Sequence, residues 1–301
     1  MLNQQQTGLI YGLTAYVLWG FFPIFFYYLS AVQPTEILTQ RIVWSFVFVL
    51  VVVMLSGKQS RIKDALKSPA TRKAMALSSV LIAINWLTFI WAVANERVLE
   101  SSFGYFLTPL VSVMLAKVFL SETLDKYRII ACVFAVIGIA IQIVLIGSLP
   151  WVSLIVSMSF GLYGLVRKQA EVDSLSGLTI ETAVLLPLAI AYWAWLATTG
   201  QSGFVSNGSG VTWLLIASGL VTALPLLLFA AAAKKLSLTA VGFMMYINPI
   251  MQMLSGIYFF GEPFDQAQLI SFGFIWVALI VFSVGAIIQQ RRMKVLANPV
   301  Q

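Results

Sequence analysis

Two apolar segments of the chain carry polar side chains at the spacing of one helix face. The positions step by three or four residues, so each set lies along one side of its helix. They are Ser101, Tyr105, Thr108 and Ser112 in the first segment, and Met245, Asn248, Gln252 and Ser255 in the second. Hydroxyl and amide groups there can bind a solute by hydrogen bonds, or they can hold neighbouring helices together. Both interpretations stay open for any single residue.

A proline follows directly after a polar residue in each segment. Pro109 and Pro249 each remove a backbone hydrogen bond and free the carbonyl four residues earlier, at Tyr105 and Met245. Interruptions at corresponding places in two halves of a transporter favour a binding site, although a simple kink is the alternative. Two further prolines are expected to hinge their segments, namely Pro23 and Pro225.

Two charged side chains lie inside apolar segments. Arg41 is a candidate for binding substrate, but it is near enough to a helix end to reach the membrane surface with its long side chain. Glu181 is a candidate for carrying a coupling proton. The alternative for Glu181 is a solvated position at the start of a helix, stabilised by the helix dipole.

Aromatic residues of several segments are candidates for a box around a planar or cationic solute, because aromatic faces attract both. Together with Asn85, the set is Trp19, Phe22, Trp86, Phe89, Phe160 and Tyr163. Such residues also pack cores and sit at membrane interfaces, and that reading stays open.

The composition indicates the class of protein to which these residues belong. Of the 301 residues, 60% are hydrophobic and only 10% are charged, against roughly 25% charged in soluble domains. The chain is therefore expected to be an all-α integral membrane protein. It has no histidine, a single cysteine (Cys132) and no phosphate-binding glycine loop, so we expect no enzyme activity, no metal and no cofactor.

A helix needs about 20 apolar residues to cross a membrane, and ten such segments fit. They are 8–30, 35–55, 74–94, 99–120, 128–147, 150–167, 177–197, 211–233, 237–260 and 267–289. With both termini in the cytoplasm, fifteen of the 18 Lys and Arg residues lie inside, Arg97 lies outside, and Arg41 and Lys117 lie within segments. This asymmetry predicts the orientation, and it explains the net charge of +7 without a nucleic-acid partner.

The second half of the chain repeats the first. At a constant offset of 140 positions, matching residues are Phe103 with Phe243, Pro109 with Pro249, Glu122 with Glu262, and Asp125 with Asp265. Because each half holds an odd number of segments, the halves enter the membrane from opposite sides. We expect two five-helix inverted-topology repeats, 1–147 and 148–301, the second with a short basic cytoplasmic tail. A duplication kept only for packing is the alternative.

The loops "SET" and "GEP", the segment "LWGFFPIFFYYL" and the order of these motifs resemble the EamA-type drug/metabolite transporters. "QRIVWSF", "SFGLYGLVRK" and the basic tail are similar to the RarD branch of that family. The resemblance implies a ten-helix inner-membrane permease, with a central cavity lined mainly by the first, third, fourth, sixth, eighth and ninth helices.

The function expected from these observations is secondary transport of a small organic metabolite or drug-like solute by alternating access. The expected location is a bacterial inner membrane, and the expected partners are the solute, membrane lipids and, at most, a second copy of the chain. Two alternatives are a lipid-handling protein, either a flippase or a lipid-modifying enzyme, and a non-transporting membrane receptor.

Overall fold

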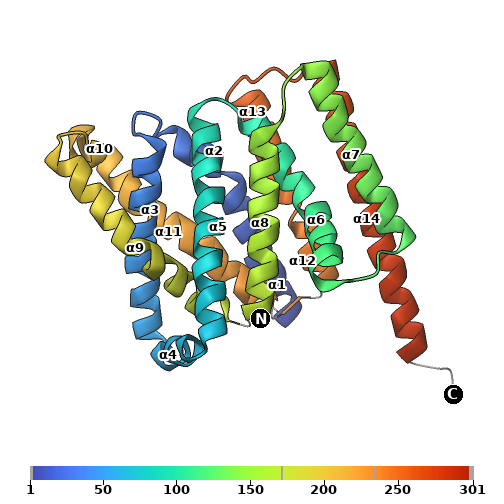
Figure 1. Cartoon of the computed structure of the whole chain (residues 1–301), viewed down its shortest axis with the longest axis horizontal. Helices are drawn as coiled ribbons and strands as arrows, with labels where there is room; N and C mark the ends of the chain where they lie inside the picture. The colour runs from blue at the N-terminus through green and yellow to red at the C-terminus, as the bar shows by residue number, and fades with distance from the viewer. Residues whose placement is uncertain (1–2, 171, 234, 237, 298–301) are drawn as a thin grey trace.

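The computed structural model is a bundle of α-helices, and it describes residues 3–170, 172–233, 235–236 and 238–297. Most helices run between two ends of the molecule and lie side by side (Figure 1). In chain order they are α1 (Gln4–Gly20), α2 (Phe22–Tyr27), α3 (Pro34–Leu55), α4 (Gln59–Lys67), α5 (Pro69–Ala94), α6 (Val98–Leu120), α7 (Lys126–Ile146), α8 (Trp151–Ala170), α9 (Ser174–Thr198), α10 (Gly203–Ser206), α11 (Gly208–Ala233), α12 (Leu238–Met244), α13 (Ile247–Tyr258) and α14 (Gln266–Ala297). The all-α class expected from the composition is confirmed.

Eight helical segments of the described chain are long and apolar enough to cross a membrane. They are α1 continued by α2, α3, α5, α6, α7, α9, α11 and α14. Large apolar side chains such as Val118 and Leu188 are exposed on their outer surfaces, as a lipid environment requires.

The other two predicted segments do not meet that standard, so the count of ten is not established by length and composition. The segment 150–167 forms α8, whose apolar run is diluted by Ser153, Ser157 and Ser159. The segment 237–260 is two helices, because α12 ends at Met244 and α13 begins at Ile247. Neither piece of the broken segment alone reaches the length of about 20 residues that a span needs.

Short polar residues define where several helices begin and end. The Asp125 carboxylate accepts hydrogen bonds from the backbone N–H groups of Tyr127 and Arg128, at the start of α7. Asp173 accepts one from Ser176 at the start of α9. Gly147 ends α7 with a left-handed backbone (φ 74°), which glycine adopts without steric cost. These caps allow tight turns between adjacent long helices.

The helix packing is preserved when the two halves are exchanged. Each helix can be replaced by its counterpart in the other half, five predicted segments away. The pair α5–α8 then becomes α11–α1, the pair α6–α8 becomes α13–α1, and the pair α3–α11 becomes α9–α5. All of these pairs are in contact, as are the self-matching pairs α3–α9, α6–α13 and α7–α14. Equivalent elements therefore meet equivalent neighbours.

Matching helices of the two halves run in opposite directions. Glu262 lies just after α13, and its carboxylate accepts hydrogen bonds from the N–H groups of Val98 (2.5 Å) and Leu99 (2.8 Å), where α6 begins. Glu36, in the first turn of α3, accepts one from the N–H of Gly203 (2.9 Å), after the end of α9. The end of one helix thus lies beside the start of its counterpart in both pairs.

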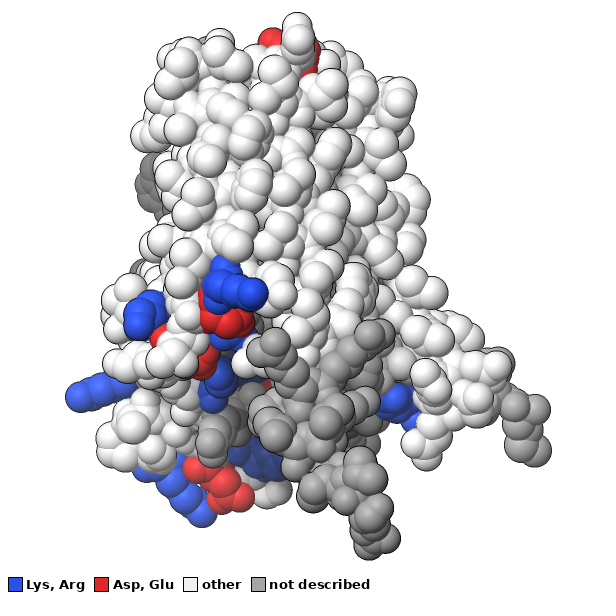
Figure 2. Space-filling model, turned by 90° about the vertical axis from the view of Figure 1, so that its right-hand side faces the viewer, with Lys and Arg blue, Asp and Glu red and all other residues white. Residues whose placement is uncertain are grey.

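Charge is distributed unequally between the two ends of the bundle. On the face that Figure 2 presents, Lys and Arg side chains appear only toward the lower end, together with acidic ones, whereas the upper end shows acidic side chains alone. The lower end, which we call the basic end, is also where α1 begins and α14 ends (Figure 1).

The predicted hinge prolines lie in different settings. Pro23 is in the first turn of α2, directly after the junction with α1, and Pro249 is in the first turn of α13. Pro109 and Pro225 lie inside α6 and α11, which continue through them. The role of all four as hinges stays a prediction.

Candidate functional site

Arg41 is buried in the middle of the bundle, with 3% of the residue exposed. Its guanidinium carbon lies 4.2 Å from the ring centre of Trp86 and just over 5 Å from those of Phe22 and Phe26 (5.5 and 5.3 Å). Its Nε donates a hydrogen bond of 2.7 Å to the Thr222 hydroxyl of α11. The sequence left open that the side chain of Arg41 extends to the membrane surface. That alternative is therefore wrong.

The polar groups of α5 and α6 meet beside this arginine. The Asn85 amide donates to the Val156 carbonyl (3.0 Å) and the Ser159 hydroxyl (3.2 Å) of α8. The Tyr105 hydroxyl donates to Asn85 Oδ1 at 3.3 Å, so the amide is bonded on both its atoms. Phe89 completes the contact, with ring centres 6.4 Å from Phe22 and 6.2 Å from Tyr105.

Six residues predicted from the sequence thus form one group, which we call the arginine cluster. Its members are Phe22, Arg41, Asn85, Trp86, Phe89 and Tyr105. They come from α2, α3, α5 and α6, and Thr222 brings α11 of the second half to the same place.

Tyr163 and Trp19 lie next to the arginine cluster rather than in it. The ring of Phe160 contacts both Tyr105 (6.3 Å) and Tyr163 (5.8 Å), which links the cluster to α8. Trp19 contacts Tyr16 of its own helix and, across the α1–α11 interface, Phe229. The predicted aromatic box is thus partly assembled.

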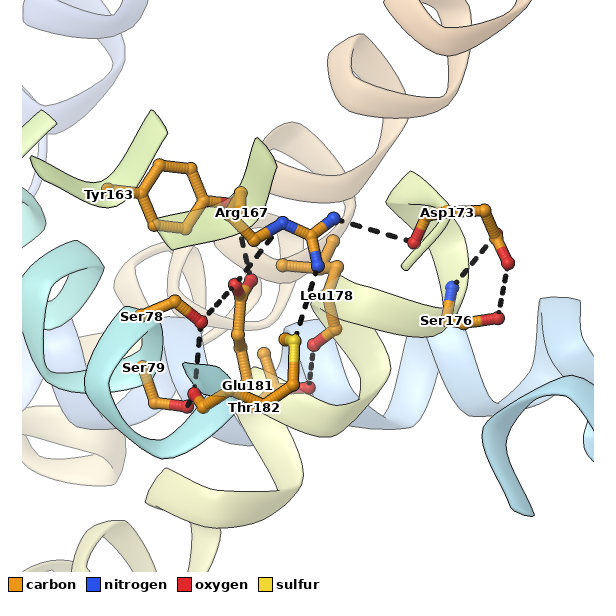
Figure 3. Close-up of polar contacts among 10 residues, drawn as sticks. Ser78, Ser79, Tyr163, Arg167, Asp173, Ser176, Leu178, Glu181 and Thr182 are labelled. Carbon is orange, nitrogen blue, oxygen red and sulfur yellow. Dashed lines mark hydrogen bonds and ion pairs between the residues drawn. The ribbon is translucent and has the colours of Figure 1, made fainter. Parts of the chain in front are cut away.

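Glu181 is the centre of a second buried polar group (Figure 3). Its carboxylate accepts hydrogen bonds from the Ser78 hydroxyl (2.8 Å) and the Tyr163 hydroxyl (3.3 Å), and it lies 3.6 Å from Arg167 Nε. Its side chain is 1% exposed. The alternative of a solvated position at a helix start is therefore wrong.

The two predicted polar faces meet where α6 packs on α13. Gln252 of α13 accepts a hydrogen bond from Ser101 of α6 (3.2 Å), which ties the two helices together. It donates one to Asn248 of its own helix (2.8 Å). Thr108 and Ser112 donate instead to carbonyls of their own helix, those of Gly104 and Thr108. Gln252 and Ser101 therefore hold helices together, while Asn248 and Ser112 stay partly exposed.

That Pro109 and Pro249 free the carbonyls of Tyr105 and Met245 stays a prediction. The carbonyl of Pro249 itself accepts a hydrogen bond from Ser102 (2.8 Å), an acceptor that the sequence did not indicate. Met245 lies half-buried in the break between α12 and α13. Whether the freed carbonyls bind a solute stays a prediction.

Three contributors to these groups were missed from the sequence. They are Thr222, Ser78 and Arg167. Thr222 and Ser78 are isolated hydroxyls in apolar segments. Their position deep within those segments was the only sequence signal for them, and it is a weak one. Arg167 was counted only among the basic residues of the cytoplasmic loops, because nothing in a linear sequence shows that it reaches Glu181.

An apolar cavity lies apart from the arginine cluster, between α6, α13 and α14. Its volume is about 480 Å³, and its lining includes Phe106, Tyr246, Ile250, Met253 and Trp276. None of the site residues predicted from the sequence lines it.

Comparison with known proteins gives a consistent result along the whole chain. The sequence pattern of the EamA-like transporter family matches residues 6–144 and again residues 149–284. A protein named RarD from Escherichia coli (strain K12) is 41% identical over 290 residues, which cover 96% of this chain and 98% of that protein. A protein of Vibrio cholerae named as an uncharacterized transporter is 40% identical over 282 residues, which cover 94% of this chain and 93% of that protein.

A solved structure titled "Crystal structure of protein" has the same fold. It superposes with a TM-score of 0.57 at 16% sequence identity, and the match covers 92% of this chain and 97% of the other. At that identity the likeness shows the fold alone.

Proposed function

The chain belongs to the EamA-like transporter family, and from this premise we propose that it is a secondary transporter of a small organic metabolite or drug-like solute. It is a multi-pass membrane protein and a member of a transporter family. The further parts of the proposal are alternating access, the inner membrane of a bacterium, and a binding site between the two halves of the chain.

The proposed architecture is ten membrane-crossing segments in two inverted halves, 1–147 and 148–301. In this proposal α8 and the broken pair α12–α13 cross the membrane together with the eight apolar segments. Three observations support it: the opposite directions of α3 and α9 and of α6 and α13, the packing partners that exchange with the halves, and the family pattern that matches twice.

The proposed orientation places the basic end in the cytoplasm. Basic residues are enriched in cytoplasmic loops, and on the face that Figure 2 shows the Lys and Arg side chains lie toward the end where α1 begins and α14 ends. Both termini are then cytoplasmic, and Arg97 lies at the outer end.

The observation that carries the proposal is the convergence of both halves on one buried cation. Inverted repeats in transporters place their substrate site near the membrane midplane, at the interface of the halves. Arg41 of the first half is bonded to Thr222 of the second, inside the arginine cluster. We propose that this cluster, extended by Trp19, Thr108, Ser112, Tyr163, Met245, Asn248 and Gln252, binds the solute.

We propose Glu181 as the residue that couples transport to protons. It is a buried carboxylate bonded to helices of both halves, through Ser78 of α5 and Tyr163 of α8. Gain or loss of its proton would therefore change contacts between the halves. The proposed unit is the chain alone or a homodimer in lipid, without a cofactor.

The test is solute exchange by the purified protein in liposomes, measured over a panel of metabolites with and without a pH gradient. We expect counterflow of at least one solute, its loss in Thr108→Ala and Asn248→Ala, and loss of the pH-gradient effect in Glu181→Gln. Val118→Ala, at a position exposed on the outer surface, is the matched control and should exchange normally. Absence of counterflow for every solute would contradict the proposal.

The apolar cavity between α6, α13 and α14 favours one competing function, lipid handling. It is large enough for part of an acyl chain. The same liposomes discriminate the two functions, because a flippase would move a labelled phospholipid between leaflets and show no counterflow of soluble metabolites.

A further inference from the structure

Arg41 and Arg167 differ in how their charge is compensated, although both lie largely out of contact with solvent. Arg167 is compensated in the usual way, since its Nε lies 3.6 Å from the Glu181 carboxylate. Arg41 is more deeply buried, yet within the described part of the chain no Asp or Glu oxygen lies within 4.0 Å of its guanidinium. Among the residues that the structure describes, the hydrogen bond of Arg41 goes to a neutral hydroxyl, that of Thr222.

The nearest acid on the same helix is already committed elsewhere. Glu36 accepts hydrogen bonds from the Ser202 hydroxyl (2.7 Å) and from the backbone N–H groups of Gly203 (2.9 Å) and Phe204 (3.2 Å). Those bonds fix the loop after α9, so Glu36 is not available as a counter-ion.

The guanidinium also keeps an unused donor. Nη1 of Arg41 is buried and, among the described residues, has no hydrogen-bond partner. The three aromatic faces around the guanidinium attract its charge but accept no ordinary hydrogen bond from it. A buried charge that lacks both a counter-ion and a partner for its N–H groups is costly, and inside a membrane such residues usually have a functional partner.

We propose that the missing partner is part of the solute, and that the solute is an organic anion. This inference rests on the proposed transport function and narrows it to a substrate class. Arg41 binds a carboxylate or a similar oxyanion through its free Nη1, because the planar guanidinium matches the geometry of such groups. The flat or apolar body of the solute lies against the rings of Trp86, Phe22 and Phe89.

The test sorts the exchange panel by charge. It includes phenylacetate, phenylacetamide and 2-phenylethylamine, which share a ring and a short chain and differ in charge. We expect the wild-type protein to exchange anionic members, and a related anion to compete with them more strongly than its neutral amide. Arg41→Gln should weaken anion exchange by about 10- to 100-fold, the usual effect of losing a hydrogen bond to a charged group.

Two variants make the result specific. Arg41→Lys keeps the positive charge without the planar fork, and it should retain part of the anion exchange. Lys117→Gln removes a basic side chain from the exposed surface of α6, and it should exchange as the wild type does. If Arg41→Gln does not fold, the charge selectivity of the wild-type protein still decides the question.

The outcomes separate this inference from the function it rests on. Exchange limited to neutral or cationic solutes, or anion exchange that Arg41→Gln leaves intact, would overturn the inference and leave transport standing. Absence of exchange for solutes of every charge would instead overturn the proposed transport function, and the inference with it.

Discussion

Glu262 is a half-buried carboxylate at the end of the bundle opposite the basic one, in the loop before α14. Burial, together with the neighbouring carboxylates of Glu96 and Glu100, raises the pKa of Glu262 from 4.5 to about 7. The N–H groups of Leu99 and Val98 act against this shift by binding the charged form. The folded protein therefore holds a proton on Glu262 more tightly than the unfolded chain does.

This shift predicts a pH dependence of stability. A carboxyl whose pKa is raised by folding contributes stability that is complete below about pH 4.5 and is lost as the pH rises toward about 7. The melting temperature should therefore fall over that interval. In Glu262→Gln, which cannot titrate, the fall should be smaller, and equal curves for the two proteins would contradict the assignment.

The pair of Arg167 and Glu181 predicts a different kind of effect. Replacing one partner of a buried ion pair leaves the other uncompensated, which typically costs about 3–5 kcal/mol. Glu181→Gln and Arg167→Met should each lower the free energy of unfolding by that order. The double variant should lose less than the two changes added together. Additive losses would show that the two side chains do not interact.

At the residue scale, the sequence identified members of the site better than their partners. Helix spacing and the rarity of charge in apolar segments were enough to select Arg41, Asn85 and Tyr105. They could not show that Arg41 is buried against Trp86, because burial depends on which helices become neighbours. The solvated interpretation of Glu181 failed for the same reason.

Helix α6 approaches α8 closely at one glycine. A Cβ atom added at Gly104 would lie 2.7 Å from the Ser153 carbonyl oxygen, which is backbone and cannot move aside by itself. Ser153 also donates a hydrogen bond to the Glu100 carbonyl across this contact (2.5 Å). The interface that places Tyr105 beside α8 thus depends on a residue without a side chain.

Gly104→Ala should therefore destabilise the protein, by about 1–3 kcal/mol, as overpacking typically does. Gly164→Ala is the matched control, because a Cβ atom there meets nothing within 4 Å. Thermal unfolding of both variants in detergent is the measurement. Equal stability of the two variants would show that α6 and α8 can move apart without a loss of folding free energy.

At the element scale, apolar length predicted most helices but not their interruptions. Eight of the ten predicted segments are long apolar helices, since hydropathy measures the property that membrane insertion requires. The break between α12 and α13 lies near Pro249, whereas α6 continues through the matching Pro109. Prolines at matching positions thus gave different helices, because tertiary packing decides whether a proline breaks or only bends a helix.

The two halves match in packing but not in their charged loops. Glu262 is bonded to the start of α6, whereas its counterpart Glu122 has a side chain that is 41% exposed and lies 3.8 Å from Lys168 and 4.0 Å from Arg128. Under the proposed alternating access, this difference between the loops of the two halves belongs to one of the two states. The repeat itself was visible in the sequence, because identities at one constant offset survive without any structure.

The most direct test of alternating access asks whether one position in the proposed site meets water from both sides. Asn248→Cys, in a Cys132→Ser background that removes the single native thiol, provides a reporter at the α6–α13 interface. Its labelling by a membrane-impermeant thiol reagent is measured in right-side-out and in inside-out vesicles. The proposal predicts labelling from both sides, slowed by a transported solute. Labelling from one side only, or from neither, would contradict it.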